Sequence, residues 1–311
     1  MVFNQQLIGG VILKKDLFSE SERLSEISKY LRRTFELWGY KEIFLPSVEE
    51  YSPNLRRGLK IAYNNEFYLV KPDMTSQIAF NMKSPKAMKI YYISEVLNDI
   101  RGKWQAGLEF IGGSEEYMAV EILSVVITSL EALNIQDFYI DVGSLAVWRN
   151  ALSGMEKFEK SIFEALAKRN FGIIESLPIS EEKKEELWRL FNFRGKKSGV
   201  EKVDRIVEAL GDDRVFIDFG TIRPLPYYDD VIFEVYSPKL GKPIGGGGGY
   251  KIGGLSAFGF AFNLKALAKL YTGKFEKSRK VLKGLDSYRE ARRLVKLGIP
   301  VEVRENEDST S

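Results

Sequence analysis

Apolar residues recur at three- and four-residue steps between Ser19 and Trp38, which predicts an amphipathic helix. Its apolar face is formed by Leu24, Ile27, Leu31, Phe35 and Trp38. Ser19 and Glu22 have the spacing of a capping box at the start of this helix, and Gly39 is placed to end it. We expect a short strand at 41–46, stopped by its final proline.

Runs rich in tyrosine, phenylalanine, isoleucine and valine predict most of the other strands, at 66–71, 89–94, 104–112, 137–142, 214–219, 231–236 and 258–262. Helical periodicity predicts helices at 115–133, 155–168, 181–191, 200–210 and 263–270. Strands outnumber helices, and many strands follow one another without a crossover helix. This order predicts an α+β fold, with an antiparallel sheet flanked by helices rather than a doubly wound parallel sheet.

Two changes of pattern divide the chain. Between about residues 151 and 211 the pattern becomes helical and more charged, which predicts a helical insertion. After residue 272 a basic stretch is followed by one expected helix at 287–297, one expected strand at 299–303 and an acidic tail that we expect to be disordered. We therefore predict a main domain at 1–272 and a small C-terminal segment at 273–311.

The composition, 44% hydrophobic and 29% charged, is ordinary for a globular protein. No apolar run is long enough to cross a bilayer, and residues 1–15 lack the layout of a signal peptide. These observations predict a cytoplasmic protein that does not associate with membranes.

The chain contains neither cysteine nor histidine. This composition excludes disulfides, thiolate nucleophiles, a Ser-His-Asp arrangement and most zinc sites. The net charge of +3, from 46 basic and 43 acidic residues, is too balanced to indicate nucleic-acid binding by itself.

Two of the predicted strands carry polar side chains that could form a site. Asp73 and Thr75 follow the strand at 66–71, where Asp73 could bind a ligand or simply cap the next helix. Gln105 and Glu109 are four residues apart in a strand, so they point to the same face of the sheet. That face could bind something polar, or it could be solvated.

Two further segments lie nearer the C-terminus. Arg223, Tyr227 and Tyr228 combine a cation with two phenols in a proline-containing turn before a strand, although paired tyrosines often serve only for packing. Residues 245–249 are five consecutive glycines, which could form a flexible hairpin loop or let the backbone approach a ligand closely. They are not a Walker phosphate loop, because no Gly-Lys-Ser/Thr follows.

Together these segments resemble the catalytic core of histidyl-tRNA synthetase, a class II synthetase, over roughly residues 17–270. Residues 38–46 resemble the first class II motif at the dimer interface, and residues 91–109 resemble the second motif. Residues 247–250 and 257–261 are similar to the glycine-rich strand and the third motif. The resemblance implies that histidine is contacted by Asp73, Thr75, Gln105, Glu109, Arg223, Tyr227 and Tyr228.

The chain departs from the synthetase pattern where ATP would bind. The second-motif arginine that grips the α-phosphate corresponds to Asn98, and the third-motif arginine corresponds to Ala266, preceded by Lys265 in place of a glutamate. A charge-assisted hydrogen bond contributes about 1.5–3 kcal/mol. Losing two such hydrogen bonds would weaken nucleotide binding by roughly 10²- to 10⁴-fold. The resemblance therefore implies a pocket for the amino acid without the residues that bind ATP.

That combination resembles the regulatory subunit of ATP phosphoribosyltransferase. Asp-Met-Thr at 73–75 and Ile-Asp-Val-Gly-Ser at 140–144 are similar to segments of these regulators. The resemblance implies a protein with no catalytic residues and no cofactor, with histidine as effector and a short-form catalytic subunit as partner. It also implies a homodimer within a hetero-oligomer, a hetero-octamer by resemblance. Pro224, Pro226 and Asp229 depart from the recognition loop of both families.

Two other functions stay open. A divergent enzyme could still activate an amino acid by using Arg101, Lys103 or Lys265 in place of the lost arginines. A nucleic-acid-binding relative could use the basic residues at 274–283. Nucleic acid is the less expected partner, because 288–303 would supply only one helix–strand unit of an anticodon-binding domain.

Overall fold

The computed structural model describes residues 17–55, 57–84, 86–97, 102–168, 170–223, 227–273 and 279–305. The chain divides into two compact units, Met1–Thr272 and Gly273–Ser311. Asn98, Arg101, Pro224, Pro226, residues 274–278 of the basic stretch and the tail after residue 305 lie outside the described residues.

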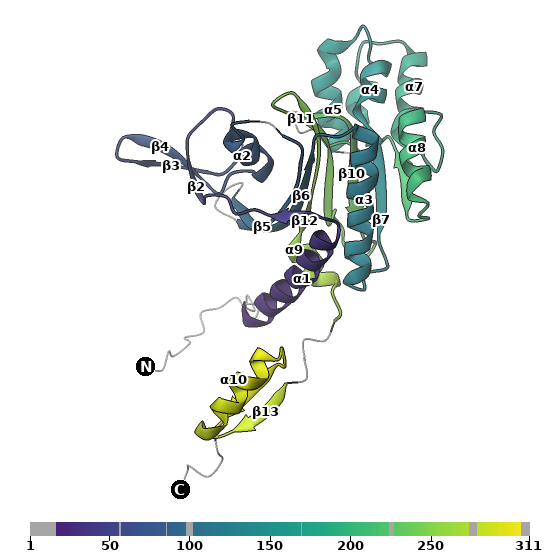
Figure 1. Ribbon diagram of the computed structural model, residues 1–311. Helices are drawn as coiled ribbons and strands as arrows, with labels where there is room; N and C mark the ends of the chain where they lie inside the picture. The colour runs from purple at the N-terminus through teal and green to yellow at the C-terminus, as the bar shows by residue number, and fades with distance from the viewer. Residues whose placement is uncertain are drawn as a thin grey trace, which may run out of the picture. The chain divides into compact units, whose positions relative to one another are not determined.

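A nine-stranded sheet forms the centre of the first unit, in the order β1-β5-β6-β12-β11-β10-β7-β9-β8 (Figure 1). Its strands are β1 (Lys41–Glu42), β5 (Met88–Leu97), β6 (Gly102–Ile111), β7 (Tyr139–Ser144), β8 (Arg194–Gly195), β9 (Val215–Asp218), β10 (Tyr228–Tyr236), β11 (Gly245–Ile252) and β12 (Leu255–Asn263). Neighbouring strands are antiparallel, as predicted, except for the parallel pairs β1–β5 and β7–β9. The sheet is therefore mixed, because helices connect β7 back to β9 in the same direction.

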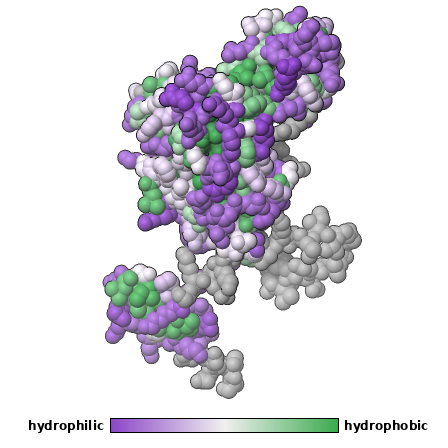
Figure 2. Space-filling model, turned by 90° about the vertical axis from the view of Figure 1, so that its right-hand side faces the viewer, coloured by the Kyte–Doolittle hydropathy of each residue, from purple (hydrophilic) through white to green (hydrophobic). Residues whose placement is uncertain are grey.

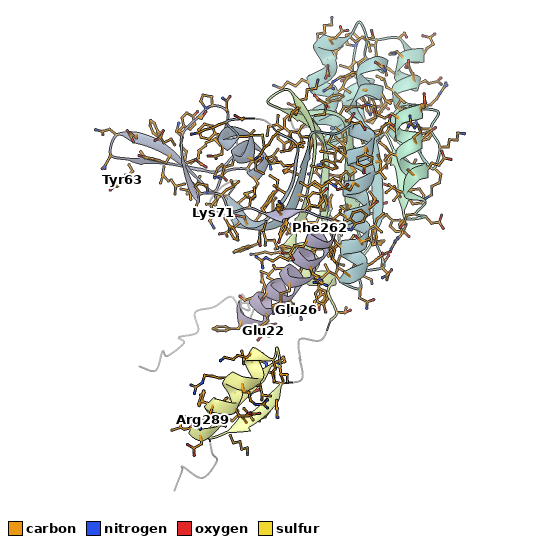
Figure 3. The ribbon with its side chains drawn as sticks, viewed as in Figure 1. Glu22, Glu26, Tyr63, Lys71, Phe262 and Arg289 are labelled. Carbon is orange, nitrogen blue, oxygen red and sulfur yellow. The ribbon has the colours of Figure 1, made fainter. Side chains whose placement is uncertain are left out.

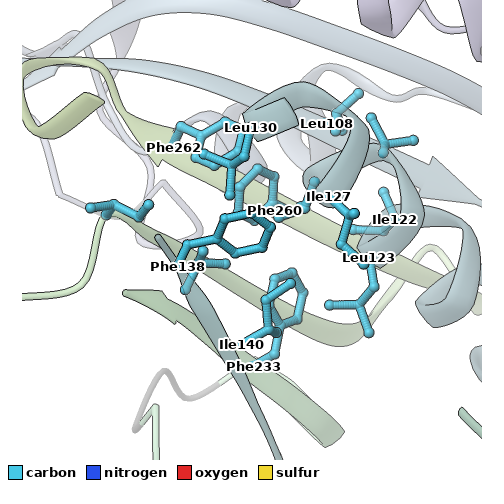
Figure 4. Close-up of a cluster of buried hydrophobic side chains, with 14 of the residues drawn as sticks. Leu108, Ile122, Leu123, Ile127, Leu130, Phe138, Ile140, Phe233, Phe260 and Phe262 are labelled. Carbon is cyan, nitrogen blue, oxygen red and sulfur yellow. The ribbon is translucent and has the colours of Figure 1, made fainter. Parts of the chain in front are cut away.

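One face of this sheet is covered by α1 (Leu17–Leu37), α3 (Glu115–Ala132), α8 (Glu201–Leu210) and α9 (Leu264–Leu270), all of which contribute to one hydrophobic core. Figure 4 shows Ile122, Leu123 and Ile127 of α3 against Phe233 and Phe260 of the strands. Alternate strand residues point to the opposite face. A second core lies there, and it includes Tyr92, Trp148 and Tyr250.

The ends of α1 differ in how well the sequence predicts them. The helix begins at Leu17, so Ser19 lies inside it and the predicted capping box is wrong. Gly39 ends the turn with φ +83°, a conformation that glycine adopts without strain, as predicted. The strand expected at 41–46 is limited to Lys41–Glu42, which pairs with β5.

A three-stranded antiparallel arm projects beside the sheet in Figure 1, in the order β2-β4-β3. It consists of β2 (Val48–Glu50), β3 (Leu59–Tyr63) and β4 (Glu66–Val70), and it leads into α2 (Met74–Asn81). Asn64 and Asn65 both have positive φ, which is the conformation of a tight hairpin turn. Figure 3 shows Tyr63 at the tip of the arm and Lys71 at its base.

The five glycines belong to β11, so the loop interpretation is wrong. A Cβ on Gly247 would lie 2.0 Å from the carbonyl oxygen of Gly259, and one on Gly249 would lie 2.4 Å from Oε1 of Glu115. Real Cβ atoms do not approach other atoms so closely. Glycine is therefore required because backbone and side chains pack directly on this strand.

α4 (Leu145–Ala151) leads into the insertion predicted at about 151–211, which contains η1 (Glu156–Phe158), α5 (Glu159–Ala167), α6 (Gly172–Glu175), α7 (Glu181–Asn192) and α8. The helix predicted at 155–168 is split into a 3₁₀ turn and α5. The segment is not purely helical, since β8 pairs with β9 and forms an edge of the main sheet.

The second unit contains β13 (Lys280–Lys283), η2 (Leu285–Ser287), α10 (Tyr288–Lys296) and β14 (Val301–Arg304). β13 and β14 are parallel, and Ala291 and Leu294 of α10 are buried.

On the side of the first unit seen in Figure 2, hydrophilic side chains cover most of the surface. Among the residues described, no helix has both the length and the apolar character needed to cross a membrane.

Candidate functional site

A small cavity of about 60 Å³ lies on the face of the sheet opposite α3. The seven residues implied by the resemblance all line it, although their chain positions extend from 73 to 228. Among the described residues, the lining consists of Arg57, Asp73, Thr75, Tyr92, Gln105, Glu109, Arg223, Tyr227, Tyr228, Gly246, Tyr250, Gly259, Phe260 and Ala261.

Strand register explains how Gln105 and Glu109 reach this cavity. Glu109 pairs with Gly259 of β12, and Gly107 pairs with Ala261. Gln105, Gly107 and Glu109 alternate along β6, so they lie on the same face of the sheet. The prediction that Gln105 and Glu109 share a face is confirmed. The solvated-face interpretation is wrong for Glu109, which is only 1% exposed.

Glu109 is a buried carboxyl group held by two hydroxyl donors. The Thr75 hydroxyl donates to Oε1 at 2.7 Å, and the Tyr250 hydroxyl donates to Oε2 at 2.7 Å. Burial raises the pKa of Glu109 to about 8, although both hydrogen bonds act to lower it and the charge of Asp73 raises it further. With a pKa of about 8, Glu109 is largely protonated at neutral pH.

Glycines provide the floor on which these side chains lie. A Cβ on Gly259 would lie 1.9 Å from Oε2 of Glu109, and one on Gly246 would lie 2.2 Å from Nη1 of Arg223. A Cβ on Gly107 would lie 2.4 Å from the Tyr92 ring. The polar groups therefore occupy space that ordinary side chains would fill.

Asp73 has two structural roles. Its Oδ2 accepts a hydrogen bond from the backbone N–H of Ser76, which caps α2, and the residue also lines the cavity. The two interpretations of Asp73 are therefore compatible. Thr75 lies in the first turn of the same helix, so the cap also positions the hydroxyl that donates to Glu109.

Arg223 and the tyrosine pair form another wall. Arg223 Nη1 donates to Glu234 Oε1 at 3.1 Å, and its Nε is buried with no hydrogen-bond partner among the residues described. The Tyr227 and Tyr228 ring centroids are 4.9 Å apart, and Tyr227 is 6.1 Å from Tyr250. Burial raises the pKa of each of these three phenols, which keeps them neutral hydrogen-bonding groups.

Three polar residues of the cavity were not predicted from the sequence: Arg57, Tyr92 and Tyr250. Tyr92 pairs with Gly107 and Tyr250 follows the glycine run, so strand register would have identified both. Arg57 lies in the turn before β3. No periodic pattern extends through that turn to identify it.

The positions that we predict to correspond to ATP-binding residues provide no cation to this cavity in the described part of the chain. Ala266 is 1% exposed and packs in the core on the α3 side of the sheet. Lys265 lies 3.6 Å from Glu20 of α1, and Lys103 does not line the cavity. Arg57 and Arg223 are the only lining cations among the described residues. In the same part of the chain, no group of acidic side chains could hold a metal ion.

This geometry suits a small molecule with both charged and polar groups. Asp73 and an ionised Glu109 could bind an ammonium group, while Gln105 and the buried phenols could bind further polar atoms. An arginine could bind a carboxylate. The cavity thus has the chemistry needed to recognise an α-amino acid.

The sequence matches the family model described as histidyl-tRNA synthetase over residues 14–209 and 181–267. The histidine–tRNA ligase of Methanocaldococcus jannaschii is 26% identical over 280 residues, which cover 74% of this chain and 66% of the ligase. The ATP phosphoribosyltransferase regulatory subunit of Caldanaerobacter subterraneus is 27% identical over 317 residues, covering 85% of this chain and 83% of that protein.

Solved structures share the fold over most of the chain. One, described as an ATP phosphoribosyltransferase regulatory subunit/histidyl-tRNA synthetase from Bacillus halodurans, has a TM-score of 0.79 at 19% identity, covering 97% of this chain and 95% of that one. A chain of the ATP phosphoribosyl transferase complex from Thermotoga maritima has a TM-score of 0.64 at 17% identity, covering 76% and 96%. These likenesses establish the class II synthetase-like fold.

Proposed function

This chain belongs to the histidyl-tRNA synthetase family, and from that membership we propose that it is a non-catalytic regulatory subunit of ATP phosphoribosyltransferase. It assembles with a short-form catalytic subunit, is required for that subunit's full activity and transmits inhibition by histidine. Its own cavity binds the histidine.

The observation that carries this proposal is a contrast between the amino-acid side and the ATP side of the expected synthetase site. Seven side chains suited to an amino acid line one cavity, from Asp73 to Tyr228. By contrast, position 266 is a buried alanine, and Lys265 is near Glu20 rather than in the cavity. Among the described residues, neither of these two positions offers a charge to the phosphates of ATP in the cavity, so an amino acid could bind without being activated.

The extent of the sequence relationship supports the same function. The aligned region covers 83% of the Caldanaerobacter regulatory subunit but 66% of the Methanocaldococcus ligase. A solved relative is also part of an ATP phosphoribosyl transferase complex. We propose that this chain forms a homodimer within a similar hetero-oligomer, in which histidine binding and partner activity are coupled reciprocally.

Glu109, Thr75 and Gln105 are the residues that we propose contact histidine from the sheet and α2. Asp73 and Thr75 lie at the same helix start and would meet the amino group together with Glu109, which accepts a hydrogen bond from Thr75, while Gln105 would contact another polar atom of the ligand. Arg223, Tyr227 and Tyr228 would close the opposite wall. The shared cavity supports these assignments.

The direct test is the rate of the cognate short-form catalytic subunit, measured with and without this chain across a histidine titration. We expect addition of the chain to raise the rate and histidine then to lower it. An unchanged rate in the presence of the folded chain would contradict the proposed partner.

Two variants test the proposed histidine site within the same assay. Glu109→Gln and Gln105→Ala should reduce histidine sensitivity while leaving assembly and basal activation intact. Glu182→Gln and Gln136→Ala are matched controls, since both residues are exposed and neither lines the cavity. Unchanged inhibition in both site variants would contradict the site.

Amino-acid activation is a second candidate, favoured by the similarity to the Methanocaldococcus ligase and by the amino-acid side of the cavity. It is tested by histidine-dependent exchange between ATP and pyrophosphate. We expect no exchange above background. Robust exchange would show an active adenylating enzyme and would overturn the non-catalytic assignment.

A further inference from the structure

The two arginines that line the cavity differ in their hydrogen-bond partners. Arg223 donates to Glu234 at 3.1 Å and contacts Tyr228. Arg57 also lines the cavity, but it forms no hydrogen bond or ion pair with another of the described residues. Of the two lining arginines, Arg57 is therefore the one whose guanidinium group has no hydrogen-bond or ion-pair partner among the described residues.

The backbone presents Arg57 in an unusual conformation. Its φ is +59°, and Gly58 follows with φ +85°. A residue with a Cβ is uncommon in this region, and such strain is found preferentially at functional sites. The local fold therefore maintains an arginine where a glycine or asparagine would be less strained.

Contacts at the base of the arm hold this turn in place. The Gly58 N–H donates to the carbonyl of Leu97, at the end of β5, at 2.7 Å. A Cβ on Gly58 would lie 3.1 Å from Cα of Pro72. Because Pro72 immediately precedes Asp73, the segments carrying Arg57 and Asp73 are packed together.

Arg57 also interacts electrostatically with the aromatic wall. Burial raises the pKa of Tyr227 and nearby acidic groups raise it further, whereas the charge of Arg57 acts to lower it. The positive charge of Arg57 therefore acts on Tyr227. A ligand in the cavity would lie within the same field.

We propose that Arg57 binds the α-carboxylate of the amino acid in this cavity. The inference rests on the proposed histidine binding and assigns a role to a residue that the family resemblance did not identify. Asp73 and an ionised Glu109 receive the ammonium group, and the planar guanidinium of Arg57 pairs with the two carboxylate oxygens. The site therefore discriminates amino acids from the corresponding amines.

Histidine and histamine test this role because they differ by the carboxylate. We expect the wild-type chain to bind histidine roughly 10- to 100-fold more tightly than histamine in calorimetric titrations. Arg57→Gln should remove most of that difference by weakening histidine binding, with histamine affinity unchanged. Arg57→Lys, which keeps the charge but not the paired donors, should restore part of it.

Arg205→Gln provides a matched control, because Arg205 is an exposed arginine of α8 whose ion pair with Glu116 is remote from the cavity lining. It should leave both affinities unchanged. Equal wild-type affinity for histidine and histamine would overturn the role of Arg57 without requiring any variant to fold. Equal weakening of both ligands by Arg57→Gln would also overturn it.

These outcomes are distinct from failure of the proposed function. If histidine binds the wild-type chain but Arg57→Gln changes nothing, the histidine site stands and the carboxylate assignment is wrong. If neither ligand binds the wild-type chain in complex with its catalytic partner, the proposed histidine site and the inference both fail.

Discussion

Glu109 and Gly259 lie directly opposite each other in the register of β6 and β12, and a Cβ on Gly259 would be 1.9 Å from Oε2 of Glu109. The carboxyl group therefore occupies the volume of a missing side chain. It is accessible to the cavity only because the neighbouring strand has glycine at this position.

Gly259→Ala should displace the Glu109 carboxyl group and its hydrogen bonds. We expect overpacking to lower the free energy of unfolding by about 1–3 kcal/mol and histidine affinity to fall at least about tenfold. Gly241→Ala is the control, because a Cβ there would meet no atom within 4 Å. Chemical denaturation and calorimetry would measure both effects, and wild-type behaviour of Gly259→Ala would contradict the described packing.

The raised pKa of Glu109 also makes stability depend on pH. In the folded chain Glu109 keeps its proton up to pH about 8, whereas in the unfolded chain it titrates near the ordinary value of 4.5. The folded state binds the extra proton between these values, so its free energy of unfolding should fall as pH rises through this window. The slope from this group is at most about 1.4 kcal/mol per pH unit.

Glu109→Gln removes that titration, so its stability relative to wild type should increase from pH 5 towards pH 8. Urea denaturation at a series of pH values would measure the difference between the two proteins. Glu182→Gln is an exposed control and should follow the wild-type curve. Parallel curves for wild type and Glu109→Gln would mean that Glu109 is ionised in the folded chain.

Lys202 forms the centre of a charged network that joins three elements. Its Nζ lies 2.8 Å from Glu115 at the start of α3 and 2.6 Å from Asp230 of β10. Burial alone would lower the pKa of Lys202, but the hydrogen bonds to Asp230 and Glu115 raise it. Asp230 also accepts a hydrogen bond from the hydroxyl of Ser144. The network thus connects the insertion to the strand that begins at Tyr228.

Lys202→Met should leave two carboxylates without their shared cation. We expect the free energy of unfolding to fall by about 1–2 kcal/mol, a value limited by the partial exposure of the lysine. Arg205→Met removes a single exposed ion pair from the same helix and should change it by less than about 1 kcal/mol. Equal effects in urea denaturation would contradict a special role for the network.

Side-chain patterns predicted most of the main sheet, because its strands bury apolar residues on the α3 side at every second position. They did not predict β2 and β3, since these strands are short and the side chains of Val48, Ile61 and Tyr63 are exposed. β11 was ambiguous for a different reason. Five glycines carry no alternation of polar and apolar side chains, and only pairing with β10 and β12 defines that strand.

The cavity was predictable where a recognisable motif carried its residues. Asp73, Gln105 and Tyr227 were identified in this way and do line one cavity, although their ligand is still a proposal. Arg57 was missed because it reaches the cavity through a turn with positive φ rather than through a periodic element. Burial of Glu109 likewise depends on contacts with α2 and β11 that are distant in sequence.

The buried carboxyl group of Glu109 should also release a proton when the ligand binds. An ammonium group pairs more strongly with an ionised than with a neutral Glu109, so binding below pH 8 should drive off the proton that burial retains. Histidine affinity should therefore rise with pH between about 6.5 and 8, by up to a factor of about ten per pH unit.

Calorimetry at pH 7 in buffers with different ionisation enthalpies would count the released protons. The ligand's own titration is common to both proteins, so the difference between wild type and Glu109→Gln isolates this group. We expect wild type to release close to one more proton than the variant. Equal release, with histidine still bound by both proteins, would mean that the ammonium is neutralised elsewhere, and Asp73 would then be the group to replace.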